Sequence, residues 1–577
     1  MTKSNAAFMV NYSGLRVHKT PGQFLKGEAG YKPLLMIVAV VLFLAFIFGP
    51  TPSSLTNLVN EPNVPGFKLA SGTTTIREMV NKTNNPEAFK EWQAAVAAEK
   101  EAAAGTDEAA KAAAIAEVER TADKLDGTKK ITFLAKVTVG ILLLTAFFWA
   151  SEALSLGAVN ILVAVLMYVF AVMEPEQIAK AYMKDAVFFI AGILAIAVGV
   201  AKTGLDKRIG LILLGNIKSA WMFALVFMPL VSICAAFLSE HALVALLMPV
   251  LMGVYKATCI ANGVKRDRAL AVFLTLGLCF AANVGGPGSP AAGGRNAIMV
   301  GYFADKNIPI QFLDWMKYGM PLVPFLSLAV AIFLYISLKR KFTVKTVNPS
   351  LIVREEVKKL PKFAGKEKIM ALILIVTVGC WVLLGEDFAI GGPTIMAVLS
   401  LFIFRIVTWQ DLQRGVALDV VGMYAAACAI GTALALTGGA IWFAREFVDA
   451  LPGFMQDGNG LIVGVSILTG TVTNFMSDGA TVGAIGPVAL PMADIGGVSA
   501  WQVGLACAFS SSFANALIVG TPNNAIAYTM ARDPETGEKL VTVGDFAKYG
   551  LPAVLLNWLV LWGLGVFGWW QIVDWPH

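Results

Sequence analysis

Long apolar segments recur along this chain, and their length constrains the fold more than any other feature. A helix needs roughly 20 mainly apolar residues to cross the hydrocarbon core of a bilayer. With 57% hydrophobic and only 15% charged residues, the chain could not cover itself with an ordinary polar surface. We therefore predict an all-α polytopic membrane protein embedded in a lipid bilayer. The plainest spans are Pro33–Gly49, Ile131–Ala150, Ala153–Met173, Met316–Leu338, Met370–Leu384, Ala389–Phe404 and Leu551–Trp570.

Basic residues are unevenly distributed between the polar segments. Residues 1–32 carry five Lys/Arg and one acid, and residues 339–368 carry ten and three, whereas the tail after Trp570 has Asp574 and no base. Because short cytoplasmic segments are enriched in Lys and Arg, we predict a cytoplasmic N-terminus and central linker, and an external C-terminus. This pattern suits a multi-pass protein of a cell membrane, of the bacterial inner-membrane kind. Apolar segments flank the basic linker on both sides, which disfavours nucleic acid as its partner.

Short sequences recur in the same order in the two halves of the chain, which indicates an internal repeat. Asp314–Pro321 recurs as Asp545–Pro552, at an offset of 231 residues. Three shorter matches have offsets of 228 to 238: Arg295–Ile298 with Asn523–Ile526, Ser239-Glu240 with Ser477-Asp478, and Thr203-Gly204 with Thr437-Gly438.

The repeat and the polar segments together divide the chain into five parts. We predict a tail and first span (1–50), a polar insertion (51–130), a first repeat (131–338), a basic linker (339–368) and a second repeat (369–577). The first repeat begins outside and ends inside, and the second does the reverse, so the repeats are inverted. Inverted repeats are typical of alternating-access carriers with a site near the bilayer midplane. Within the insertion, the Ala/Glu/Lys-rich stretch Glu91–Leu125 predicts an extramembrane helical hairpin, either a solvated decoration or a partner contact.

The stretch around Ser239 predicts a re-entrant hairpin. Between Ser219 and Tyr255 only Glu240 and His241 are ionisable, while both flanks are basic and therefore cytoplasmic. The alternative is two full spans with Ser239-Glu240-His241 in an external turn. Because the repeat places Ser477-Asp478 at the equivalent position, we predict a second such hairpin, and about 11 spans in all.

Four ionisable residues and two Gly-rich breaks lie within these apolar regions. Ionisable groups at membrane depth are costly unless partnered, so Glu240, His241, Arg295 and Asp478 indicate a transport pathway. Arg295 can pair with Glu240 or meet an anionic substrate. The breaks, 283–296 and 520–524, suit a cavity lining in which half-helix N-termini receive anions and free carbonyls bind cations. Close helix packing is the alternative explanation for the glycines.

These motifs resemble those of the divalent anion:sodium symporter family, whose members move dicarboxylates, citrate or sulfate with sodium. The resemblance covers most of residues 131–577 but not the insertion. In that family each half has a Ser-Asn-Thr hairpin tip and a Gly-Thr-Pro-Pro-Asn break. Here the tips read Ser239-Glu240-His241 and Ser477-Asp478-Gly479, and the breaks read 292–296 and 520–524. Acids replace both tip asparagines, and both tip threonines are lost. The resemblance therefore implies the fold more strongly than it implies the substrate or the coupling ion.

The resemblance implies an elevator-like homodimer and two overlapping sets of site residues. The substrate set is Ser239, Glu240, His241, Gly293, Arg295, Asn296, Ser477, Asp478, Gly479, Thr521, Pro522, Asn523 and Asn524. The coupling-ion set, where a sodium ion could bind, is Ser239, Glu240, Ala292, Thr473, Met476, Ser477, Asp478 and Gly520.

We therefore predict a secondary active transporter of a small anion, coupled to Na⁺ or H⁺, rather than an enzyme. A cation/proton antiporter would account for the two acids but not for Arg295, and an uncoupled anion exchanger is a further alternative. A Ser-Glu-His hydrolase is disfavoured because consecutive side chains point apart and the second repeat has no His. No cofactor is expected. The six cysteines lie in apolar stretches without paired spacing, which indicates neither disulfides nor a metal site.

Overall fold

The computed structural model describes residues 31–65, 67, 69–104, 106–215, 217–238, 240–308, 310–345, 358, 360 and 362–573. Helices form nearly all of the regular structure in these residues. In place of strands, this part of the chain has only two isolated bridges, Tyr31 with Leu154 and Arg532 with Lys539. The prediction of an all-helical fold is therefore confirmed.

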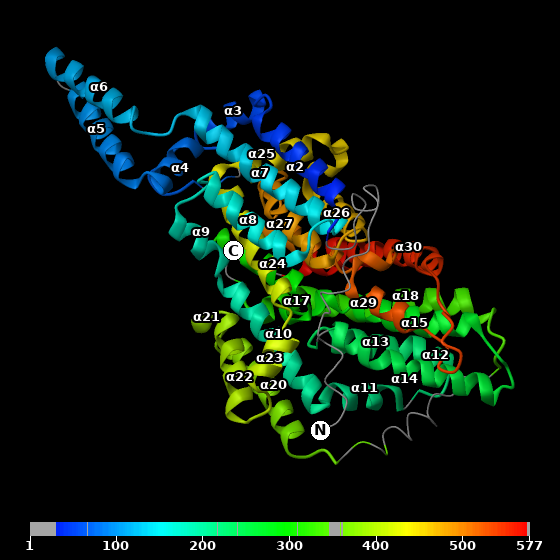
Figure 1. Ribbon diagram of the computed structural model, residues 1–577. Helices are drawn as coiled ribbons and strands as arrows, with labels where there is room; N and C mark the ends of the chain where they lie inside the picture. The colour runs from blue at the N-terminus through cyan, green and yellow to red at the C-terminus, as the bar shows by residue number, and fades with distance from the viewer. Residues whose placement is uncertain are drawn as a thin grey trace, which may run out of the picture.

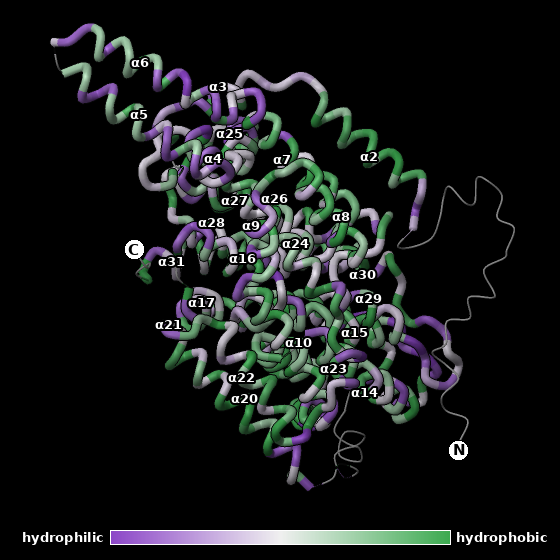
Figure 2. Tube along the Cα trace, turned by 60° about the vertical axis from the view of Figure 1, so that its left-hand side comes forward, coloured by the Kyte–Doolittle hydropathy of each residue, from purple (hydrophilic) through white to green (hydrophobic). Residues whose placement is uncertain are grey.

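Seven helical segments in the described part of the chain are long and apolar enough to cross a bilayer. An eighth arises if α2 (Pro33–Phe48) and α3 (Ser53–Asn60), bent by 58°, form one span. The residues of α2, α20 (Lys366–Leu383) and α22 (Gly391–Ile403) are mainly hydrophobic (Figure 2). The seven segments are Thr128–Ser151, Pro175–Thr203, Glu240–Ala261, Arg268–Gly288, Phe312–Lys339, Leu418–Thr437 and Val543–Ile572.

The two halves contain equivalent helices in the same order. The first half runs α7 (Thr128–Ser151), α8 (Leu156–Val169), α9 (Pro175–Tyr182), α10 (Asp185–Thr203), α11 (Leu205–Gly215), α13 (Met228–Ala235), α14 (Glu240–Ala261), α15 (Arg268–Asn283), α16 (Gly294–Asp305), α17 (Phe312–Gly319) and α18 (Val323–Lys339). The second half runs α20, α22, α23 (Trp409–Gly415), α24 (Leu418–Thr437), α25 (Gly439–Ala450), α26 (Gly458–Val472), α27 (Asp478–Ile495), α28 (Ala500–Ser510), α29 (Pro522–Met530) and α30 (Val543–Val560). In the second half, α30 and the π-helix that continues it, Leu561–Trp569, take the place of α17 and α18.

Repeated glycines occupy equivalent positions in both halves. Gly204 and Gly438 end α10 and α24 with φ of 75° and 76°, in the left-handed region that favours glycine. A Cβ at Gly319 would stand 1.9 Å from the carbonyl oxygen of Pro287, and one at Gly550 would stand 2.1 Å from that of Asn515. Each of the latter two glycines therefore lets a helix lie directly against the backbone of its half's broken span.

The helices of the two halves pack against one another reciprocally. α10 packs on α22 and α24 packs on α8, while α14 contacts α29 and α16 contacts α27. The last pair, α16 and α27, begins near the centre of the molecule and ends beside the insertion. The α14–α29 pair ends on the other side, where Lys256 Nζ lies 2.8 Å from Glu535 Oε2. The figures likewise show α27 on the insertion side and α14 far from it (Figures 1 and 2).

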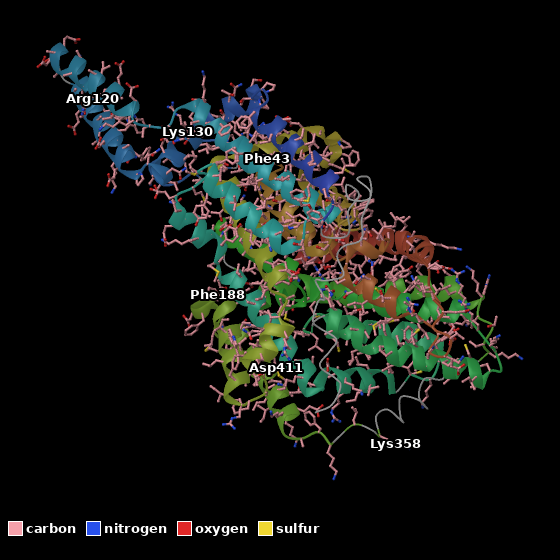
Figure 3. The ribbon with its side chains drawn as sticks, viewed as in Figure 1. Phe43, Arg120, Lys130, Phe188, Lys358 and Asp411 are labelled. Carbon is pink, nitrogen blue, oxygen red and sulfur yellow. The ribbon has the colours of Figure 1, made fainter. Side chains whose placement is uncertain are left out.

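The insertion docks through its first two helices and projects with the next two. Arg445 of α25 pairs with Glu61 at 2.8 Å, and Trp442 Nε1 donates to Ser54 Oγ at 3.0 Å. After α4 (Ile76–Asn84), α5 (Pro86–Ala104) and α6 (Glu108–Ala122) form an antiparallel hairpin that extends away from the body (Figure 1). Arg120 lies on this projecting part, far from the helices of the two repeats (Figure 3).

Candidate functional site

Four helix starts converge at the centre of the described structure. In each hairpin a short first arm, α13 or α26, leads to a tip from which the second arm, α14 or α27, leaves. The half-helices α16 and α29 begin after the two breaks. Because α14 packs on α29 and α16 packs on α27, each tip lies beside the break of the other half. Helix N-termini carry partial positive charge, so this centre is suited to negative groups.

Arg295 joins the acids of both hairpin tips. Its Nη1 lies 2.8 Å from Glu240 Oε1 and also forms an ion pair with Asp478 Oδ2. Its Nε donates to Ser512 Oγ at 3.0 Å. The Arg295 side chain is 1% exposed, and those of Glu240 and Asp478 are 4% and 13% exposed. Glu240, Arg295 and Asp478, hereafter the ion cluster, thus form a buried triplet with two negative charges and one positive charge when ionised.

Glycines of the first break make room for the guanidinium. A Cβ at Gly286 would stand 2.0 Å from Arg295 Nη2 and 2.2 Å from Ser512 Oγ. One at Gly293 would stand 2.8 Å from Arg295 Nη1. All three distances are below van der Waals contact, so the space that Arg295 occupies favours glycine at these two positions.

His241 points to the break of the second half. Its Nδ1 lies 2.5 Å from Asn523 Oδ1, an acceptor, so the ring donates through Nδ1. Asn523 Nδ2 in turn donates to Asn283 Oδ1 at 2.8 Å, and Asn283 Nδ2 donates to Asn515 Oδ1 at 3.0 Å. This chain of side chains links one hairpin tip to both breaks.

The last asparagine of each break holds that break in shape. Asn296 Nδ2 donates to the carbonyl oxygens of Gly286 and Ser289, and Asn524 Nδ2 donates to those of Ala514 and Leu517. In both cases the acceptors precede the asparagine by 10 and 7 residues. The side-chain N–H groups of these two residues are therefore engaged by the breaks themselves.

The other expected coupling-ion residues of the second half gather around its hairpin tip. Thr473 Oγ1 donates to the Ser511 carbonyl at 2.7 Å, and Ser477 Oγ accepts from Ala480 N at 3.4 Å, which caps α27. A Cβ at Gly520 would stand 2.7 Å from the Thr473 carbonyl oxygen, so break and tip touch. A cavity of about 390 Å³ lies beside them, lined in part by Met476, Ser477, Thr521 and Pro522.

A smaller cavity of about 170 Å³ adjoins the ion cluster itself. Its polar border includes Glu240, His241, Arg295 and Asp478, and its opposite wall is apolar side chains of α10. The expected residues Ala292, Gly293 and Pro522 also line it. Gly479 lies next to this region, because a Cβ there would stand 3.0 Å from Tyr424 Cε1. Ser239 lies outside the described residues.

Three polar residues at the centre escaped the sequence analysis as site residues. Asn283 and Ser512 stand at the start of the two breaks, where the repeat could have drawn attention to them. Tyr424 lines the smaller cavity from α24 and packs over Gly294, where a Cβ would stand 2.0 Å from its hydroxyl oxygen. It belongs to no repeated motif, so no signal in the sequence marked it.

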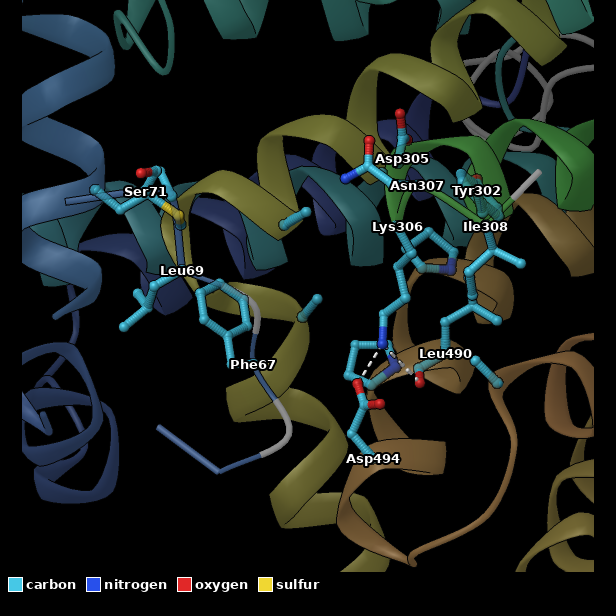
Figure 4. Close-up of a pocket in the computed structure, with 18 residues that line it drawn as sticks. Phe67, Leu69, Ser71, Tyr302, Asp305, Lys306, Asn307, Ile308, Leu490 and Asp494 are labelled. Atoms are coloured by element: carbon cyan, nitrogen blue, oxygen red, sulfur yellow. Dashed lines mark hydrogen bonds and ion pairs between the residues drawn. The ribbon is translucent and has the colours of Figure 1, made fainter. Parts of the chain in front are cut away.

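A larger cavity, about 740 Å³, is lined by none of the expected site residues. It lies under the insertion, at the ends of α16 and α27. In Figure 4, Phe67, Leu69 and Ser71 of the insertion face Lys306, which reaches towards Asp494 and Leu490. Of the charged residues that line this cavity, Lys306 pairs with Asp494, and Asp305 pairs with Lys184 outside the cavity, so we assign the site to the buried ion cluster.

A family model described as the sodium:sulfate symporter transmembrane region matches residues 127–575. The chain belongs to this family. Its members are divalent anion:sodium symporters, so the protein is a multi-pass membrane protein and a secondary anion transporter. The matched region begins where the insertion ends.

Several curated proteins are similar over most of their length. The sodium-dependent dicarboxylate transporter SdcS of Staphylococcus saprophyticus is 23% identical over 462 residues, covering 75% of this chain and 85% of the relative. The sodium-dependent high-affinity dicarboxylate transporter 3 of Caenorhabditis elegans is 24% identical, covering 70% and 78%. Among solved structures, Neisseria gonorrhoeae MtrF superposes with a TM-score of 0.47 at 12% identity, covering 68% of this chain and 83% of that one.

Proposed function

We propose that this protein is a cation-coupled symporter that carries a small anion through a site at the ion cluster. The observation that carries the proposal is the meeting of both hairpin tips at one buried arginine, beside a cavity of about 170 Å³. Two buried carboxylates would repel an anion unless a cation neutralised them. Binding of cation and anion would then be coupled thermodynamically, as symport requires.

The proposed anion site uses the N-termini of α16 and α29 together with His241. Both half-helices begin at the centre, so their free N–H groups and partial positive charges are available to an anion. Relatives named as sodium-dependent dicarboxylate transporters support a dicarboxylate, citrate or sulfate as substrate. The substrate and coupling-ion residues given above from the family resemblance form this proposed site.

We further propose an elevator-like homodimer in which hairpins, breaks and half-helices move together. The N-terminus and the linker would lie in the cytoplasm and the insertion outside, in a cell membrane such as a bacterial inner membrane. The short first arms support re-entrant hairpins, because α26, at 15 residues, is only about 22 Å long. That is too short for a bilayer core of about 30 Å.

Uptake into proteoliposomes tests this function. Labelled succinate, citrate and sulfate would be offered with an inward sodium gradient, an inward proton gradient or neither. We expect concentrative uptake of at least one anion with one of the gradients. Exchange without any response to either gradient would contradict symport and favour an uncoupled anion exchanger.

For the coupling cation we propose the proton, because Glu240 can carry one and His241 adjoins it. Glu240→Gln should then abolish stimulation by the proton gradient while some anion exchange remains. Full sodium dependence, with no response to pH at saturating sodium, would show instead that the acids are sodium ligands.

A cation/proton antiporter is the second candidate, and one observation favours it. Arg295 is engaged by Glu240, Asp478 and Ser512, so its presence is explained without any anion. Sodium-driven proton efflux from the same liposomes, recorded with a pH-sensitive dye in the absence of any transported anion, would support the antiporter over the symporter.

A further inference from the structure

The ion cluster is one positive charge short of neutrality. Glu240 and Asp478 bring two negative charges, and Arg295 brings one positive charge. The other titratable side chains at this centre are His241, Tyr424 and Cys279, and His241 and Cys279 bond to the second break through Asn523 and Asn524. A net buried charge is costly in a low-dielectric interior, so one further cation is needed to balance the cluster.

The oxygen atoms that could bind that cation lie between the two hairpin tips, around a gap too narrow for a water molecule. Glu240, Asp478, Ser511, Ser512, Thr521 and Asn283 border a narrow gap next to the guanidinium. Thr521, 3% exposed, has a buried Oγ1 with no hydrogen-bond partner in the part of the chain that the structure describes. Carboxylate, hydroxyl and amide oxygens are the ligands that small hard cations prefer. An orphaned hydroxyl in a gap lined by acids therefore points to a cation rather than to an anion.

The guanidinium, by contrast, has little capacity left for an anion. Of its five N–H donors, one goes to Ser512, two on Nη1 go to the two acids, and one on Nη2 faces Glu240 Oε2 at 3.4 Å. A bidentate anion could bind Arg295 only by displacing a carboxylate. The glycine cradle at Gly286 and Gly293 also fixes the guanidinium between the tips.

We propose that Arg295 is a resident counter-cation for the two hairpin tips, which leaves the ion cluster with a requirement for one exchangeable monovalent cation instead of two. The cation occupies the gap bordered by Glu240, Asp478 and Thr521. This inference rests on the location of the proposed site but not on the identity of the transported anion. It makes Arg295 a residue that sets the coupling ratio, because a tethered charge returns with the empty carrier and is never released.

The number of cations bound by the ion cluster can be measured on purified charge variants of the protein in detergent. The thermal unfolding midpoint is measured against the logarithm of sodium concentration at constant ionic strength and high pH, and then against pH in choline without sodium. Because a ligand that binds only the folded state stabilises it, the slope at saturation reports the number of cations bound. No transported anion is needed, so failure of the uptake experiment and failure of this one are distinguishable.

The variants should differ from the wild type by whole cations. We expect the slope for Arg295→Gln to correspond to one more bound cation than in the wild type, and the slope for Glu240→Gln to one fewer. The double variant should have the wild-type slope. Arg445→Gln removes an arginine whose partner, Glu61, lies in the insertion, so it serves as the matched control and should keep the wild-type slope.

A wild-type slope in either Arg295→Gln or Glu240→Gln, for sodium and protons alike, would overturn the proposal. If Arg295→Gln does not fold, Glu240→Gln and Asp478→Asn decide it. Each of these variants neutralises one acid, so in each the slope should fall by the amount that corresponds to one bound cation. Retention of the full slope in both would show that Arg295 is not the counter-charge of the tips.

Discussion

At the scale of single residues, the centre of this protein is built around the volume of one arginine side chain. Arg295 is buried, contacts both hairpins and excludes a Cβ at two glycines of its own break. Overpacking a rigid interior typically costs 1–3 kcal/mol, because neither backbone nor neighbours can move far. The position of Arg295 in the ion cluster therefore depends on these glycines as well as on the two acids.

Gly286→Ala tests this close packing. The new methyl group would stand 2.0 Å from Arg295 Nη2, so we expect the free energy of unfolding to fall by about 1–3 kcal/mol and uptake to be lost. Thermal unfolding in detergent and uptake into liposomes measure the two effects. Gly253→Ala is the control, since a Cβ there meets nothing within 4 Å and alanine favours a helix by about 1 kcal/mol. Equal behaviour of the two variants would contradict the packing argument.

The sequence indicated which charged residues matter, but only part of how they are paired. Burial of Glu240, Arg295 and Asp478 followed from their apolar surroundings, and a pairing of Arg295 with Glu240 was one of two options. The contact with Asp478, 183 residues away, depends on how the halves pack, which no local pattern encodes. The bond of the His241 ring to Asn523, in the other half, depends on the same packing.

At the scale of elements, the insertion divides into a docked part and a projecting part. Its first helices hold onto α25 through Glu61 and Ser54. The α5–α6 hairpin has few buried residues, among them Phe89, Ala95 and Thr121, and no contact of the hairpin reaches the ion cluster in the described structure. Whether the hairpin is a solvated decoration or a contact for a partner stays a prediction.

The projecting hairpin can be deleted because its two ends lie close together. Lys124 Nζ lies 2.5 Å from Glu91 Oε2, so a short Gly-Ser linker can replace residues 92–123. Because mostly exposed side chains are lost, we expect the free energy of unfolding to change by less than about 0.5 kcal/mol and anion uptake to persist. Thermal unfolding and liposome uptake check this. Loss of uptake with an intact unfolding transition would instead reveal a contact that the transporter needs, such as a partner chain.

Helix type and order were accessible from the sequence, and exact helix ends were less so. Apolar length predicted the spans, and the repeated Lys-Tyr-Gly-x-Pro motif predicted equivalent positions for Gly319 and Gly550. The spans α8 and α22 are shorter in the structure than their apolar runs, because 153–155 and 389–390 lie outside the helices. The number of membrane crossings stays a prediction.

At the scale of the whole molecule, the proposed elevator would require the central helices to slide along the long helices around them. α16 carries Arg295 at one end and packs on α10, α24, α27 and α28. In the proposed elevator, α16 and α27 move together, whereas α10 and α24 belong to the fixed part. Lys184, directly before α10, forms an ion pair with Asp305 at the end of α16, and in the proposed elevator this pair would have to break in each cycle.

A disulfide between α16 and α24 gives the most direct test of that motion. A Cβ at Gly301 would stand 3.3 Å from Cys428 Sγ. This distance suits a disulfide, because in the bonded pair that Cβ and that sulfur are separated by only one C–S bond and one S–S bond of about 2.05 Å. Gly301→Cys should therefore cross-link to the native Cys428 under a membrane-permeant oxidant, as mass spectrometry of the linked peptides would show. We expect oxidation to stop uptake and dithiothreitol to restore it, since a covalent bond between a moving and a fixed helix prevents sliding. Gly301→Cys combined with Cys428→Ala carries the same added side chain without the bond, and its uptake should not respond to the oxidant. Full uptake by the cross-linked protein would mean that α16 and α24 move as one body, and the elevator division would be wrong.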